Sequence, residues 1–484
     1  MASVLSFPAS SHAVINGSFY RNPAYSIWST VSVDKAGKLI NSGPFPYPSA
    51  STPFIAAVPE FNNILGQGAT LKVVAQATYA AFHEAGVYIP STKQVYFSSN
   101  RLNTTNKTTY QFPTYAQFNK VALSPSADGT YKWSTIFPPS SDFILPNGGT
   151  IYNGQVLMAV QGYQLNVPSS LVLVNPKTNQ GKTLLNNFYG RAFNSINDVA
   201  VLNPNGLVQE QWVFFVDPPY GYFQGFKPYP SLPAQAYAFH PPSGMIRVVA
   251  DGFERPNGIQ FSEDFKTCYV SDTGFISAVS GDPHPQDGSR PGTIYAFDVV
   301  SPPKGSDPRL YPPTLTNRRV FAFVDSGMPD GIKVDTEGNV YAGCFDGVHV
   351  SAAFHRCASA GIHFNMPIST STNPTPIVDN MTDRDSEAAA QVYRTIQSMS
   401  PHSHAVIKGP FDRDPARSIW TTFRIGSEGN QPVFSLGIER PFIAVSKDFY
   451  DIVGPDAELR VIVEANTPQF HEGEHFIMSE THIL

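Results

Sequence analysis

Short runs of alternating hydrophobic and polar residues, separated by turns, recur along the middle of the chain. At residues 255–274, RPNGIQFSEDFKTCYVSDTG, Ile259 and Phe261 alternate on one strand, a polar turn follows, and a second strand returns. The same order returns at three other places, residues 84–99, 196–217 and 328–344. The pattern therefore predicts a β protein assembled from repeated hairpins.

Further strand pairs follow these hairpins. Residues 236–239 with 245–250, and residues 293–297 with 319–324, are alternating apolar runs that each come after a hairpin. Each unit then has four strands, and units recur at a spacing of roughly 40–75 residues, as the blades of a β-propeller with loop insertions do. Residues 100–145, apart from a strand at residues 120–123, and residues 275–292 are predicted to be such loops.

Each hairpin carries a polar residue where its first strand begins. These residues are two carboxylates and two amides, namely Glu84, Asn197, Asn257 and Asp330. A radial array of hairpins brings such side chains together at one end of a central axis. Oxygen ligands of this kind suit calcium, magnesium or manganese, and a metal site with open positions can activate water for ester hydrolysis. A carboxylate beside that water can act as general base.

A purely structural interpretation exists for every one of these residues. Asn-Gly and Asp-Gly are ordinary turn sequences, Asp198 after Asn197 can cap a strand, and Glu84 alone can be a solvated loop acid. The functional interpretation rests on their recurrence at equivalent positions. For the aromatic loop at residues 217–222, a pocket wall and a rigid proline turn are equally good interpretations.

Composition and charge exclude several classes of protein. Charged residues make up 14% of the 484, the chain has 43 Pro and 36 Gly, and its net charge is −6 with no basic block. We therefore expect a turn-rich β protein that binds no nucleic acid, and no apolar run is long enough to span a membrane. No secretory signal is recognisable, although four N-glycosylation patterns occur, so the compartment and the oligomeric state stay open. The four patterns are at Asn16, Asn103, Asn106 and Asn380.

The chain repeats part of itself near its end. SHAVIKGPFDRDPARSIWTT at residues 403–422 matches residues 11–30 at 14 of 20 positions, and Phe-His-Glu at residues 470–472 repeats residues 82–84. We therefore predict three parts. Residues 1–350 form the propeller, residues 351–402 are a linker without blade pattern, and residues 403–484 are a partial duplicate of residues 11–84.

Several segments together resemble the gluconolactonase/regucalcin family, especially its fungal lactonohydrolases. They are FNSINDVAV, VDPPYG, ADGFERPNGIQFSEDFKTCYVSDTG and GMPDGIKVDTEGNVYAGCFDGVHV, within about residues 82–350. The resemblance implies a six-bladed propeller that hydrolyses sugar lactones or related cyclic esters with one divalent cation, commonly calcium. It implies that Glu84, Asn257 and Asp330 bind the metal, that Asp330 is the general base, and that Asn197 contacts substrate. The family's last blade has no counterpart after residue 350, so we expect that blade to be incomplete or replaced.

The sequence thus predicts an enzyme, a metal-dependent lactonase acting on a small sugar lactone or a pantolactone-like ester. One alternative is a catalytically inactive propeller that serves as a metal- or carbohydrate-binding scaffold, and another is an esterase of open-chain esters. Glu84 and Glu472 lie in matching contexts, and only Glu84 is followed by a complete hairpin. We therefore expect Glu84, held by paired backbone, to be the ligand.

Overall fold

The computed structural model describes most of residues 61–104, 112–277, 287–352 and 355–360, together with six short strands elsewhere. The chain divides into two compact units. The first contains residues 1–376 and 400–420, and the second contains residues 377–399 and 421–484. No helix among the described residues is long and apolar enough to cross a membrane.

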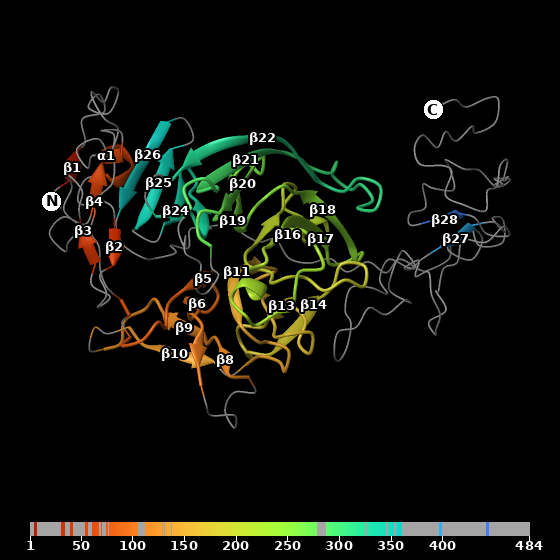
Figure 1. The fold of residues 1–484 in the computed structure, drawn as a ribbon, viewed down its shortest axis with the longest axis horizontal. Coiled ribbons are helices and arrows are strands. Elements are labelled where there is room, and N and C mark those ends of the chain that lie inside the picture. The colour runs from red at the N-terminus through yellow and green to blue at the C-terminus, as the bar shows by residue number, and fades with distance from the viewer. Residues whose placement is uncertain are drawn as a thin grey trace. The chain divides into compact units, whose positions relative to one another are not determined.

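Five sheets, antiparallel apart from one strand pair in the fifth, dominate the first unit, and Figure 1 shows them in chain order around a centre, coloured from orange to cyan. The first contains β5 (Glu84–Ile89), β6 (Gln94–Ser98), β9 (Phe118–Ala122) and β10 (Trp133–Ile136). The second contains β11 (Pro146–Tyr152), β12 (Gln155–Val160), β13 (Ser170–Val174) and β14 (Gly181–Leu185). The third contains β15 (Val199–Leu202), β16 (Trp212–Asp217), β17 (Gln235–His240) and β18 (Met245–Ala250). The fourth contains β19 (Pro256–Phe261), β20 (Thr267–Asp272), β21 (Thr293–Val300) and β22 (Thr314–Phe323).

The fifth sheet combines both ends of the first unit. It contains β23 (Ile332–Val334), β24 (Val340–Gly343), β25 (Val348–Ala352), β26 (His355–Ala360), β4 (Phe54–Ala56) and β1 (Val4–Ser6). β4 pairs antiparallel with β26 and parallel with β1. An N-terminal strand thus extends the last blade that the structure describes.

The remaining described elements of the first unit are short. They are β2 (Val31–Val33), β3 (Leu39–Asn41), β7 (Leu102–Asn103), β8 (Thr114–Tyr115), α1 (Phe61–Leu65), α2 (Tyr220–Phe223) and a 3-10 helix at Val208–Glu210. In the second unit β27 (Ile396–Ser398) pairs in parallel with β28 (Phe442–Ala444).

The core lies between neighbouring sheets, because successive side chains of a strand point to opposite faces. On β12, Val156 and Met158 pack toward the first sheet, whereas Leu157 and Ala159 pack toward the third. The same alternation fills the spaces between the third, fourth and fifth sheets. This radial packing of four-stranded sheets is the architecture of a β-propeller.

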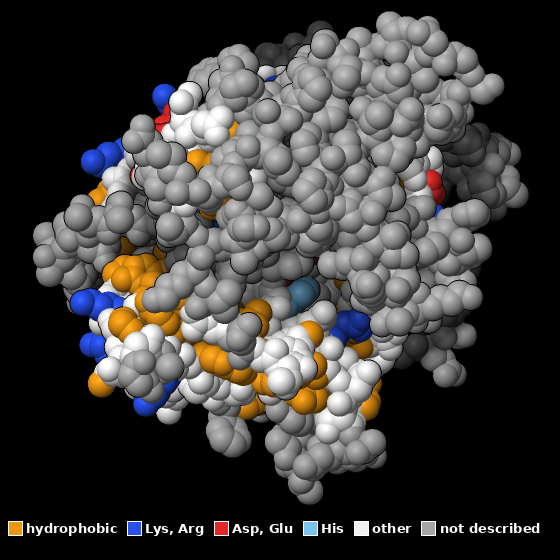
Figure 2. All heavy atoms as spheres, turned by 90° about the vertical axis from the view of Figure 1, so that its left-hand side faces the viewer, with side chains coloured by type: hydrophobic (Ala, Val, Ile, Leu, Met, Phe, Trp, Pro, Cys, Tyr) orange, Lys and Arg blue, Asp and Glu red, His pale blue; other side chains and the backbone are white. Residues whose placement is uncertain are grey.

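The face of the first sheet that points away from the second carries a smaller cluster of Val95, Phe97 and Val121, against which Trp133 is partly buried. Phe82 stacks on Phe97 at 5.0 Å between ring centroids and is 38% exposed. In the view of Figure 2, hydrophobic side chains of the described residues gather in the lower half of the face shown. Apolar surface thus extends beyond the spaces between sheets.

The predicted propeller is confirmed, but the predicted number of six blades is not, since the described residues form five. The structure also places strands inside the segment predicted to be a linker, because β25 ends at Ala352 and β26 follows at residues 355–360. Of the predicted duplicate at residues 403–484, only β28 lies within the described residues. It corresponds to β4 of the first copy, and both are parallel-paired strands of sequence Phe-Ile-Ala.

Candidate functional site

The innermost strands of three sheets begin with an irregular register. The pairing shifts between Glu84 and Val87 on β5, between residues 146 and 149 on β11, and between residues 256 and 259 on β19. On β5 the shift includes Ala85 and Gly86, which both have positive φ. A β-bulge of this kind redirects a side chain at the start of a strand. The first polar residue of each strand is thereby displaced from the regular alternation.

Two glycines explain how neighbouring blades come together here. A Cβ on Gly148 would lie 2.5 Å from Asp198 Oδ1 and 2.6 Å from the carbonyl oxygen of Asn197. A Cβ on Gly258 would lie 2.5 Å from the carbonyl oxygen of Asp330. Only glycine permits such close approach of two backbones. The glycine of each Pro-Asn-Gly segment is therefore required by packing.

One cavity of about 180 Å³ collects a polar residue from each of the five sheets, on or just before the innermost strand. All four residues expected at the axis line it, and a fifth, Asn147, lines it as well. Asn147 is the residue that our sequence interpretation missed. Pro146-Asn147-Gly148 repeats Pro256-Asn257-Gly258, so the sequence did contain the pattern that identifies it.

Several oxygens at this cavity lack hydrogen-bond partners. Among the described residues, twelve buried side-chain nitrogen or oxygen atoms have none, and four of them are Oδ1 atoms at this cavity. These four atoms belong to Asn147, Asn197, Asn257 and Asp330. The amide of Asn257 is oriented by its Nδ2, which donates to the Tyr220 hydroxyl at 3.1 Å. Buried acceptors without donors are costly, and their convergence fits a positively charged ligand.

The two carboxyl groups of the cavity lie close enough for one to hydrogen-bond to the other when it is protonated. Burial, followed by the charges of Asp330 and Asp198, raises the pKa of Glu84 well above its usual value. Burial also raises the pKa of Asp330, to about 6. Two acids that resist ionisation together are stabilised by a cation between them.

These residues fit a hard divalent cation. The donors are carboxylate and amide oxygens, which calcium and related ions prefer. The described residues contain no group of three or more His, Cys, Asp or Glu side chains that could hold a metal. The set at the axis has only two such side chains and is completed by amides, so its chemistry differs from that of a His- or Cys-based site.

Asp198 hydrogen-bonds to backbone amides and does not line the cavity. Its Oδ1 accepts from the amide of Val199 at 2.9 Å, and its Oδ2 accepts from the amide of Ile259 at 3.2 Å. It thus joins the innermost strands of the third and fourth sheets, in agreement with the strand-capping interpretation. Its charge still contributes to the high pKa values of Glu84 and Asp330.

The loop at residues 217–222 forms part of the cavity wall. Asp217 accepts from the backbone amide of Ser195 at 2.8 Å, and Ser195 Oγ accepts from the amide of Gly221 at 2.9 Å. This network holds α2 so that Tyr220 lines the cavity beside Asn257. The loop is therefore both a rigid turn and a pocket wall.

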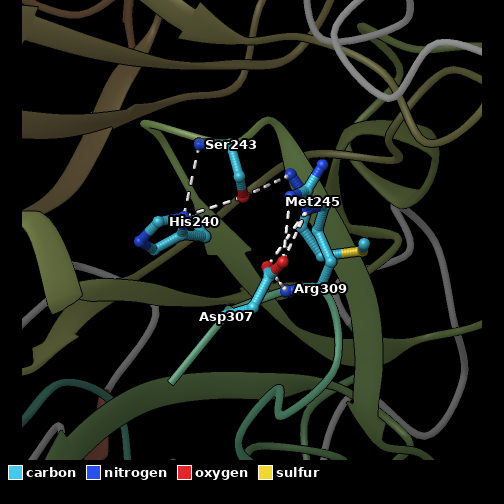
Figure 3. A network of polar contacts seen from close by, with 5 residues as sticks. All are labelled: His240, Ser243, Met245, Asp307 and Arg309. Carbon is cyan, nitrogen blue, oxygen red and sulfur yellow. Dashed lines mark hydrogen bonds and ion pairs between the residues drawn. The ribbon is translucent and has the colours of Figure 1, made fainter. Parts of the chain in front are cut away.

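A second polar cluster, shown in Figure 3, lies at the end of β17. His240 Nδ1 lies 2.8 Å from Ser243 Oγ, and His240 Nε2 lies 2.8 Å from the carbonyl oxygen of Gln209. Asp307 forms an ion pair with Arg309 at 2.9 Å. Both ring nitrogens of His240 are engaged in structural hydrogen bonds, so this cluster fastens loops and offers no free group for chemistry.

Residues 145–376 match the sequence profile of the SMP-30/Gluconolactonase/LRE-like region. Over these residues the chain is similar to the gluconolactonase-like family. It is 31% identical to lactonohydrolase oryL of Aspergillus oryzae over 55% of this chain and 58% of that protein. It is 27% identical to a gluconolactonase of Zymomonas mobilis over 39% of this chain and 47% of that protein. A solved gluconolactonase structure from Xanthomonas campestris covers 58% of this chain and 76% of its own, with 21% identity and a TM-score of 0.40.

The matches to these two curated relatives span about half of their length. The profile match covers the second to fifth sheets, and therefore Asn147, Asn197, Asn257 and Asp330. Glu84 lies on the first sheet, before the residues that the profile matches, but it lines the same cavity as these four residues. The similarity to this family therefore covers four of the five polar residues collected at the cavity.

Proposed function

We propose that this protein hydrolyses a lactone with the help of a divalent cation held at the axis cavity. Calcium is the first candidate for this cation. The observation that carries the proposal is the convergence of four unpartnered oxygens, from four sheets, beside the buried carboxyl of Glu84. The names of the relatives, lactonohydrolase and gluconolactonase, support the class of reaction.

Glu84, Asn257 and Asp330 would bind the cation, because they combine the two carboxylates with the amide that Tyr220 orients. A bound cation of this kind polarises an ester carbonyl and lowers the pKa of water beside it. Asn197 and Asn147 have free oxygens at the same cavity, so they would orient the substrate and water through hydrogen bonds.

Asp330 would act as the general base. Burial raises the pKa of Asp330 without a cation, and a bound cation would favour the ionised carboxylate, which can accept a proton from water. The water oxygen adds to the lactone carbonyl carbon, and the ring C–O bond then breaks. The ring oxygen takes up a proton, and the product is the open hydroxy acid.

The test is hydrolysis of D-glucono-1,5-lactone and pantoyl lactone by the full chain, followed with a pH indicator. Chelation should abolish the reaction and added calcium should restore it, whereas Asp330→Ala should reduce it to background. A matched control is Asp335→Ala, because Asp335 lies in the turn between β23 and β24, where it accepts from the amides of Glu337 and Asn339.

Three results would contradict the proposal in different ways. Calcium binding without any turnover would favour the inactive scaffold. Turnover of phenyl acetate but of no lactone would favour an esterase of open-chain esters. Hydrolysis that withstands the chelator, or that Asp330→Ala leaves unchanged, would place the reaction outside the proposed site.

A further inference from the structure

Arg101 stands at the rim of the axis cavity and has no counter-charge among the described residues. It belongs to the segment after β6, on the first sheet, and it lines the cavity together with Gln224, which follows α2 of the third sheet. Its Nη1 donates to the carbonyl oxygen of Gln224 at 3.4 Å, and its guanidinium carbon lies 5.5 Å from the centre of the Phe226 ring. Arg101 is exposed, and these two contacts place its guanidinium beside the segment that follows α2.

Most of the hydrogen-bonding capacity of this side chain is unused. A guanidinium has five N–H donors, and the described contacts of Arg101 use one of them, with a long bond. None of the described ion pairs includes Arg101. Partial burial alone lowers the pKa of Arg101, and no neighbouring acid opposes this effect.

The other charges around the cavity balance one another once a cation is bound, and the positive charge of Arg101 is left without a counter-charge. Glu84 and Asp330 carry two negative charges, which a divalent cation balances. The negative charge of Asp198, behind the cavity wall, is opposed by Lys333, which lowers the pKa of both Asp198 and Glu84. Once the cation is bound, the cavity therefore has one uncompensated positive charge, that of Arg101.

We propose that Arg101 forms an anion subsite and that the preferred substrate is a lactone carrying a second, ionised carboxylate. This inference rests on the proposed function, since it assumes that a cation and a lactone occupy the same cavity. A guanidinium binds a carboxylate through two parallel hydrogen bonds, which lysine cannot reproduce. The lactone carbonyl would lie at the axis, and the carboxylate would point to the rim.

The experiment compares two lactones that differ only in the terminal group. D-Glucono-1,4-lactone has a neutral hydroxymethyl group where D-glucaro-1,4-lactone has a carboxylate. We expect kcat/KM to be higher for the glucarolactone. Arg101→Gln should lower the ratio of the two kcat/KM values by about tenfold to a hundredfold, as expected for loss of a charged hydrogen bond. Arg101→Lys should restore part of the ratio.

The control is Arg319→Gln, which removes the same charge from an exposed residue of β22 that pairs with Asp298. It should leave the ratio unchanged. An unchanged ratio in Arg101→Gln, or an equal loss with both lactones, would overturn the subsite and leave Arg101 a purely structural residue. An equal loss in Arg319→Gln would show a long-range charge effect and overturn it too.

A binding measurement separates this inference from the proposed function. If neither lactone is hydrolysed, the proposed function fails, and calorimetric titration of the calcium-loaded protein with D-glucaro-1,4-lactone decides the subsite. Binding that Arg101→Gln abolishes and Arg319→Gln preserves would support the subsite even then. Absence of binding to the unaltered protein, or binding that survives Arg101→Gln, would overturn it.

Discussion

In the absence of calcium, the Asp330→Asn variant should be more stable than the unaltered protein. In the presence of calcium, it should be less stable than the unaltered protein. Asparagine keeps the shape of the side chain and removes one charge from the buried pair with Glu84. The pKa of Asp330 in the folded chain is about 6, against an ordinary value of 3.8. Ionised Asp330 therefore costs the folded state ~3 kcal/mol at neutral or higher pH. With chelator present, the free energy of unfolding of the variant should therefore exceed that of the unaltered protein by up to this amount.

Added calcium should reverse the order of stability of the two proteins. A ligand present at about 100 times its Kd stabilises the folded state by about 2.7 kcal/mol. The unaltered protein should gain an increment of this kind, and Asp330→Asn should gain little of it, because a carboxylate ligand is lost. The assay is urea denaturation at about pH 8, with chelator and with calcium, for both proteins.

Asp335→Asn is the matched control, because Asp335 accepts hydrogen bonds from the amide of Asn339 at 2.8 Å and from the Tyr341 hydroxyl at 2.9 Å. It should destabilise the protein under both conditions and leave the calcium increment intact. The reasoning would be refuted if Asp330→Asn lowered stability in chelator, as a structural aspartate would, or if it kept the full calcium increment.

Three other predictions follow from the same geometry. Asn197→Ala should lower kcat while leaving the calcium affinity mostly intact, because we assign this amide to the substrate; a large loss of affinity in a calcium titration would make it a ligand instead. Glu84→Gln should abolish calcium binding and Glu472→Gln should not, so the reverse result would give the site to the second copy. In chelator, the stability of the unaltered protein should fall as the pH rises from 3.8 to about 6. The reason is that the folded state holds the Asp330 proton more tightly than the unfolded state, in which the carboxyl titrates near 3.8. This contribution is fully present below pH 3.8 and lost above 6, and a flat denaturation profile over this range would contradict it.

The local sequence was sufficient to predict the hairpins and the residues at the starts of their first strands. Asn257 and Asp330 were found because a turn sequence precedes an alternating strand in both cases. Asn147 follows the same rule, but its hairpin stands directly after residues 100–145. That segment was predicted to be mainly loop, whereas it contains β7 to β10 and supplies the outer strands of the first sheet. The Pro-Asn-Gly sequence would have identified Asn147.

Other features depend on contacts between distant segments, which no local pattern reveals. β4 is a three-residue apolar strand that pairs with β26, about three hundred residues later, and its sequence alone does not identify its partner. The place of Arg101 depends on its contact with Gln224, which is 123 residues away in the sequence. The number of blades was likewise inferred from a resemblance, since no local sequence encodes how many sheets complete a ring.

The most direct test of the account is a crystal structure of the full chain with calcium, or with terbium as its anomalous scatterer. We predict one strong peak at the axis cavity, within about 2.3–2.6 Å of carboxylate or amide oxygens from Glu84, Asn257 and Asp330. A cavity without a peak, or a cation bound by residues of another part of the chain, would contradict the central claim.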